Sequence, residues 1–165
     1  MNIKRIARHL LVTHRHVDKT LPRRVLNSVE HAIKTSEATH SGQVRFAVEG
    51  ALDGAPLFEG QTARHRAIEV FAQLGIWDTE HNNGVLVYVL LADRAVEIVA
   101  DRGVHAKVGA KEWEAICRKM ETAFQQNDFE GGVLSGIEAV TLHLVKHFPA
   151  YGAHPNELPD KPVLL

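Results

Sequence analysis

Apolar residues recur at three- and four-residue spacing in four segments of the chain, which predicts four amphipathic helices. These helices cover residues 21–40, 63–74, 110–124 and 128–147. Thr20 suits the N-cap of the first helix, with Pro22 in its first turn, and Gly75 suits the end of the second. The apolar stripes are Val25, Val29 and Ile33; Ala63, Ala67, Val70, Phe71 and Leu74; Trp113, Ile116, Met120 and Phe124; Val133, Ile137, Val140, Leu144 and Phe148.

Three short segments predict β-strands: QVRFAVE at 43–49, VLVYVLL at 85–91 and AVEIVA at 95–100. The second is apolar on both faces, as expected for a central strand covered by helices on each side. A helix separates the first two strands, so they run parallel, whereas only three residues join the last two, which therefore form an antiparallel hairpin. We predict an α/β fold, a three-layer α/β/α sandwich with a mixed sheet of about four strands, in which a βαβ unit precedes a β-hairpin and C-terminal helices.

The two ends of the chain differ from its middle in composition. We therefore predict a basic arm at 1–20, a domain at 21–148 and a proline-rich tail at 149–165. In the arm, Ile3, Ile6, Ala7 and Leu10 lie on one helical face, and five lysines and arginines stand against a single acidic residue, Asp18. Two interpretations stay open, a helix docked on the domain or a helix that lies on an anionic membrane surface. Four prolines in the tail predict an extended strap over the surface.

Composition narrows the class of protein. The chain has 165 residues, 45% apolar and 24% charged, which suits one globular domain. A net charge of −1 excludes a dedicated nucleic-acid binder, and the single cysteine, Cys117, excludes an internal disulfide. Without an apolar run of about 20 residues or a signal-peptide pattern, we expect a cytoplasmic protein, peripheral at the inner membrane face if the arm binds lipid.

The Asn83-Gly84 pair has the composition of a hairpin turn, yet it precedes the strand at 85–91. Because the hairpin is antiparallel, we expect this pair to lie beside Asp101-Arg102-Gly103 at one end of the sheet. The parallel strand at 43–49 begins at the same end and brings His40 and Ser41 there. We call residues 80–84 and 101–103 the rim.

Oxygen-bearing side chains gather in the rim, and such oxygens are the ligands that Ca²⁺ or Mg²⁺ prefers. The predicted ligands are Asp101, Asn82, Asn83 and Glu80. An Asn-Gly turn also permits left-handed backbone angles that point carbonyls into a concavity. The structural alternative is that the glycine ends the loop sterically and the asparagines bond only local backbone.

Candidate catalytic groups are few. For phosphate chemistry the rim offers Arg102 as a phosphate ligand and His81 as a general acid. The chain contains no nucleophile elbow, P-loop or HExxH motif, so we expect no nucleotide or organic cofactor. Asp128 could belong to a second metal site, but the preceding helix should carry it to the far end of the sheet, where an N-cap role is expected.

Three blocks resemble the TPM domain family over residues 21–148: the Ser-Gly entry to the first strand, NNGVLVYVLLADRAVEIVADRGV and FQQNDFEGGVLSGIEAV. WDTEHNNGVLVY and NELPD are similar to a soluble bacterial branch of that family. The resemblance implies a sheet of about four strands between helices and a divalent-metal site in some members. It also implies weak acid phosphatase activity in the plant branch and an envelope-associated partner of the LemA type. The family's usual aspartate falls on Asn82, which removes one negative charge from the rim.

Two functions therefore stay open. The first is an accessory or interaction module with a divalent-cation site at the rim. The second is a weak divalent-metal-dependent phosphatase that acts on small phosphoesters. The missing carboxylate at position 82 favours the first.

Overall fold

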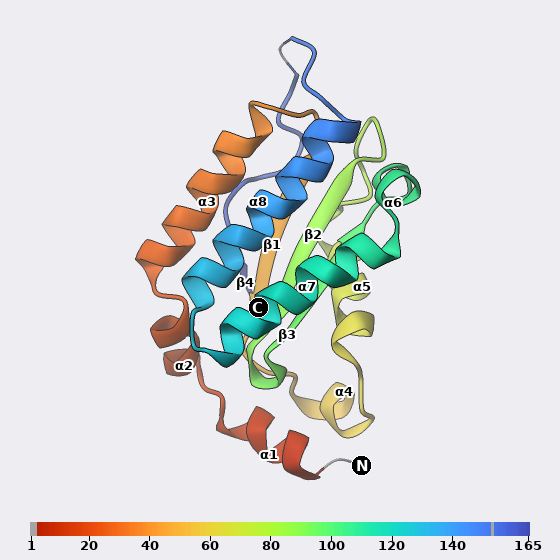
Figure 1. Cartoon of the computed structure of the whole chain (residues 1–165). Coiled ribbons are helices and arrows are strands. Elements are labelled where there is room, and N and C mark those ends of the chain that lie inside the picture. Colours follow the sequence, from red (N-terminus) through yellow and green to blue (C-terminus); the bar gives the residue numbers. More distant parts are fainter. Residues whose placement is uncertain (1–2, 153) are drawn as a thin grey trace.

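The computed structural model describes residues 3–152 and 154–165 and contains one four-stranded sheet between helical layers (Figure 1). The strands are β1 (Gln43–Glu49), β2 (Gly84–Leu90), β3 (Ala95–Ala100) and β4 (Val163–Leu164), in the order β3-β2-β1-β4. β1 runs parallel to β2 and β4, and β2 runs antiparallel to β3. The predicted mixed sheet, with a βαβ unit followed by a hairpin, is confirmed.

Helices cover both faces of this sheet. They are α1 (Ile3–Leu11), α2 (His14–Thr20), α3 (Arg23–Glu37), α4 (Gly54–Phe58), α5 (Ala63–Gln73), α6 (Arg102–Val108), α7 (Ala110–Gln125) and α8 (Phe129–His147), and a 3-10 turn, η1 (Leu91–Asp93), joins β2 to β3. The apolar stripes of α3, α7 and α8 share one core with Val85, Val87 and Val89 of β2. Leu86, Tyr88 and Leu90 belong to the second core, with α5. Alternate residues of β2 thus serve opposite layers, and this defines the α/β/α sandwich.

Several boundaries differ from those predicted. α3 begins at Arg23 with Pro22, in extended conformation, as its N-cap, and Thr20 instead ends α2. The link after β1 contains the short helix α4. Residues 101–103 do not form a simple turn, because Asp101 caps α6, which Gly109 ends. The proline-rich tail contributes β4, whose two residues were too few to show a strand period.

The basic arm forms α1 and α2, and α1 packs against η1 and α4. His9 on α1 is 2% exposed, whereas Leu10 and Leu11 are 67% and 78% exposed. One face of α1 is therefore docked, as the first interpretation of the arm requires, and the other faces outward. Within residues 3–152 and 154–165, no helix combines the length and apolarity needed to cross a membrane.

Candidate functional site

Backbone contacts join the parts of the rim, as the strand order predicts. The Asp101 N–H donates to Gly84 O at 2.8 Å, and Arg102 Nε donates to Asn82 Oδ1 at 3.2 Å. On the other side of β2, Asn83 Nδ2 donates to Ser41 O at 2.8 Å. The three chain segments therefore meet at one end of the sheet.

The glycines of the rim are needed for close packing. Gly84 is not in the left-handed region; Asn82 is, with a φ of 50°. A Cβ on Gly84 would lie 2.1 Å from Ile76 O, and one on Gly103 would lie 2.6 Å from Asn82 O. The Asn-Gly pair therefore lets β2 enter the sheet tightly against the loop that precedes it, which is the structural role considered for it.

Asp101 is the rim carboxylate with an uncommitted oxygen. Its Oδ1 caps α6 by accepting from the Arg102 N–H at 2.7 Å. Its Oδ2 is buried, and no donor among the described residues bonds to it. Burying a polar oxygen without a partner is unfavourable, so this atom calls for a cation or another donor. Asn83 Oδ1 is also buried without a donor from the described chain.

Two backbone carbonyl oxygens lie near the start of α6. His81 O and Asn82 O lie 3.0 and 2.6 Å from the position that a Cβ on Gly103 would occupy. These two oxygens therefore lie close to the first turn of α6, which Asp101 caps. Near the start of α6, the Asp101 carboxylate and neutral backbone oxygens thus form a donor set that suits a hard divalent cation.

Other predicted rim residues contribute less. The side chains of Glu80 and His81 are exposed, and Glu80 enters the network through its backbone N–H, which donates to Glu157 Oε2 at 2.9 Å. His40 is fully buried, with Nδ1 3.1 Å from Gly42 O. Burial lowers the pKa of His40 to about 4, so it is a neutral core residue.

Glu157, in the tail, is a carboxylate beside the rim that the sequence analysis missed. Gln43 Oε1 accepts from the backbone N–H groups of Glu157 and Leu158 at 2.8 and 2.9 Å, which fixes this part of the tail at the start of β1. The NELPD block was the available signal. Asp128 caps α8, accepting from the Gly131 N–H at 2.9 Å, as expected. In the described parts of the chain, no three His, Cys, Asp or Glu side chains form a metal-binding group.

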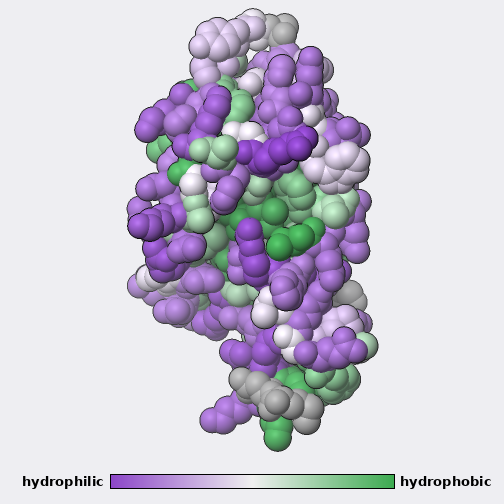
Figure 2. Space-filling view, turned by 90° about the vertical axis from the view of Figure 1, so that its right-hand side faces the viewer, coloured by the Kyte–Doolittle hydropathy of each residue, from purple (hydrophilic) through white to green (hydrophobic). Residues whose placement is uncertain are grey.

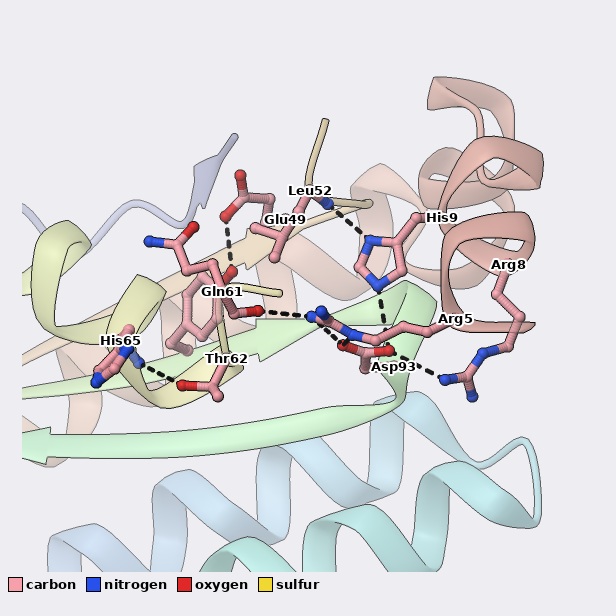
Figure 3. A network of polar contacts seen from close by, with 10 residues as sticks. Arg5, Arg8, His9, Glu49, Leu52, Gln61, Thr62, His65 and Asp93 are labelled. Atoms are coloured by element: carbon pink, nitrogen blue, oxygen red, sulfur yellow. Dashed lines mark hydrogen bonds and ion pairs between the residues drawn. The ribbon is translucent and has the colours of Figure 1, made fainter. Parts of the chain in front are cut away.

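A second aspartate lies at the opposite end of the hairpin, in η1 (Figure 3). Asp93 accepts from Arg5 Nε at 2.9 Å and from Arg8 Nη2 at 3.2 Å, and His9 Nε2 lies 3.1 Å from it. His9 Nδ1 in turn accepts from the Leu52 N–H at 2.9 Å. Burial raises the pKa of Asp93, but the contacts with Arg5 and His9 outweigh it and hold the pKa below its usual value. We call Arg5, Arg8, His9 and Asp93 the turn cluster.

Comparisons with known proteins agree with this architecture. A family model described as TPM domain matches residues 17–142. The NMR structure of the BA42 protein from the psychrophilic bacterium Bizionia argentinensis is 28% identical with a TM-score of 0.73, over 86% of this chain and 92% of that one. The N-terminal domain of a P. gingivalis protein is 22% identical with a TM-score of 0.55, over 79% of each chain, which shows similarity of fold. Among curated proteins, no match is found.

Proposed function

Because the chain belongs to the TPM domain family, we propose that it is an accessory or interaction module whose rim binds a divalent cation, Ca²⁺ or Mg²⁺. The observation that supports this most directly is the buried Asp101 Oδ2, which has no donor in the described chain. Asp101 also caps the helix whose first turn, at Gly103, packs against the 81–82 loop. A cation would satisfy this oxygen. Glu80 and Glu157, which meet at the same end of the sheet, add negative charge to the surroundings.

The affinity is expected to be low. Asp101 supplies the charge, while Asn83 and the backbone supply neutral oxygens, and affinity for Ca²⁺ increases with the number of charged ligands. Asn82 Oδ1 already accepts from Arg102, so it is a less available ligand than predicted. The guanidinium of Arg102 also opposes a second positive charge nearby.

Calorimetry with CaCl₂ or MgCl₂ titrated into EDTA-treated protein tests the proposal. An ion that binds only the folded state stabilises it by about 2.7 kcal/mol at 100 times Kd. We expect millimolar ion to raise the melting temperature of the native protein and of Asp53→Asn, which removes an exposed carboxylate outside the rim. Asp101→Asn should abolish the response. An equal shift in all three proteins, or a shift in none, would show that Asp101 is only a helix cap.

The alternative function is a weak divalent-metal-dependent phosphatase on small phosphoesters. It would use Arg102 to bind phosphate and His81 as a general acid. The Arg102 guanidinium is engaged by Asn82, and His81 is exposed, so we expect hydrolysis of an aryl phosphate to be absent or very weak. A turnover on the order of 1 per second, abolished by chelator and by Arg102→Ala, would favour the phosphatase over the accessory module.

We also propose a cytoplasmic location, with peripheral contact at the inner membrane face and an envelope-associated partner of the LemA type. The outward face of α1 supports the membrane contact. Ile3, Leu10 and Leu11 are exposed there, and the neighbouring Arg8 side chain is 56% exposed although it reaches Asp93. An apolar strip beside basic groups suits an anionic lipid surface.

A further inference from the structure

The outer edge of β3 lies in a groove away from the rim. β3 pairs with β2 along one edge and ends the sheet order on that side, and both α5 and α7 pack against it. A cavity of about 450 Å³ runs along this edge and is lined by both helices. Figure 2 looks onto this side of the molecule and shows an apolar area framed by hydrophilic groups.

Backbone groups of β3 point into this groove. The Asp101 N–H bonds to β2, and hydrogen-bonding directions alternate along a strand, so Val96, Ile98 and Ala100 direct their N–H groups outward. Side chains bind two of the outward groups. The Val96 N–H donates to Glu121 Oε1 at 3.0 Å, and Arg64 Nη1 donates to Ile98 O at 2.7 Å. A carboxylate and a guanidinium thus stand where the C=O and N–H groups of another strand would pair.

The two walls of the groove differ in chemistry. On the α7 side, the apolar part of the lining is Trp113 and the half-buried Cys117, and charged residues of the same helix border it. On the other face of β3, Glu97 lies opposite Tyr88 and 3.5 Å from Arg64. Because successive residues of a strand face opposite sides of the sheet, an added strand would place alternate side chains against apolar and acidic surroundings.

The charged groups of the groove indicate which charge its partner should carry. Its walls carry three carboxylates and two guanidinium groups. Arg64 lies 3.5 Å from Glu97 and Arg118 lies 3.6 Å from Glu114, so one carboxylate, that of Glu121, is in excess. Burial raises the pKa of Glu97; Arg64 opposes this, while Glu121 and Glu114 add to it. An incoming cation would relieve this repulsion. A second copy of the chain would instead bring two such acidic sets together.

We propose that the β3 edge binds an extended segment of another protein, with apolar residues alternating with lysine or arginine, by addition of a strand to the sheet. The incoming backbone displaces Glu121 and Arg64 from the outward groups of β3. Its apolar side chains lie over Trp113 and Cys117, and its basic side chains lie beside Glu97. This site is separate from the rim, so its occupancy does not require a cation.

NMR with a synthetic probe tests the proposal on the full chain in EDTA. The probe is an acetylated, amidated peptide of about seven residues, alternating valine and lysine. Two controls have the same length, one with alternate backbone nitrogens methylated and one with glutamate in place of lysine. We expect the valine–lysine peptide to shift the amide signals of Val96, Ile98 and Ala100 and to slow their hydrogen exchange. Binding by either control should be at least about tenfold weaker, because strand pairing and charge are both required.

A pair of variants tests the charge contact. Glu97→Gln keeps the shape of the side chain and should weaken peptide binding about fivefold, whereas Glu138→Gln, an exposed change on α8, should not. The proposal is overturned if the valine–lysine peptide leaves the β3 amides unchanged at millimolar concentration, or if the methylated peptide binds equally well. Self-association through β3 without peptide would also overturn it, by assigning the edge to a second copy. Unchanged binding by Asp101→Asn separates this site from the rim proposal.

Discussion

The two ends of the β2–β3 hairpin each hold an aspartate, and the two carboxylates are satisfied in different ways. At the closed end, Asp93 is 14% exposed and contacts Arg5, Arg8 and His9. At the open end, Asp101 bonds the Arg102 N–H through one oxygen, while the other oxygen is buried without a donor in the described chain. The first carboxylate fixes the N-terminal helix. The second keeps one oxygen without a donor from the described chain, and there we propose that a cation binds.

This difference shows why a carboxylate in a turn is not by itself a site. Both aspartates follow or precede a strand of the same hairpin, and the chain near each is rich in polar residues. What separates them is the set of donors that the rest of the fold supplies. The turn cluster receives cations from α1, whereas the rim receives carbonyl oxygens and a further carboxylate from the tail.

Replacing a glycine at each end of the hairpin should give the largest difference in stability. Gly84→Ala places a Cβ against the backbone oxygen of Ile76, which cannot move without disturbing β2, so we expect unfolding free energy to fall by about 3 kcal/mol. Gly50, whose carbonyl accepts from the Ala92 N–H at the closed end, would place its Cβ against side-chain atoms of Val17 and Val12 and against no backbone oxygen of the described residues. Gly50→Ala should cost less than about 1 kcal/mol. Urea unfolding measures the stability of both variants. Similar losses of unfolding free energy would contradict the expected difference between the two ends of the hairpin.

Asp93→Asn is expected to have the next largest effect. It removes the negative charge that contacts Arg5 and the buried His9, and should lower stability by about 2 kcal/mol at neutral pH. Because the folded-state pKa of Asp93 lies below its ordinary 3.8, its stabilisation is present above pH 3.8 and is lost as pH falls through the lowered value. The difference in unfolding free energy between the native protein and Asp93→Asn should therefore become smaller below pH 3.8. Denaturation at a series of pH values measures this, and a difference constant with pH would exclude the charge as its cause.

The smallest effect is expected for Asp101→Asn in EDTA. Asparagine caps a helix as well as aspartate, and Oδ2 has no donor in the described chain to lose, so stability should change by less than about 0.5 kcal/mol. Urea unfolding beside Asp93→Asn provides the comparison. A loss as large as that of Asp93→Asn would mean that Asp101, too, is held by the protein, and the two ends would then be equivalent.

Local sequence patterns determined most of the layers and the central contact of the rim. The stripes of α3, α5, α7 and α8 and the apolar strands predicted the sandwich, because periodicity is set by which face of each element is buried. The three-residue link between the predicted strands at 85–91 and 95–100 placed residues 82–84 beside 101–102. The left-handed backbone of Asn82 and the helix-capping role of Asp101 were harder to predict from the sequence, because both depend on the close packing at Gly84 and Gly103.

Only the tertiary structure decided how each carboxylate is satisfied. Arg5 reaches Asp93 across 88 residues, and Glu157 reaches Glu80 across 77, so no local period or spacing relates these pairs. The same holds for β4, whose two residues become a strand through the edge that β1 offers them. The sequence alone determined which segments are buried and how β1, β2 and β3 pair. The directions from which donors reach Asp93 and Asp101 depend on the docking of both chain ends, because a hydrogen bond is formed by proximity in space and not by distance along the chain.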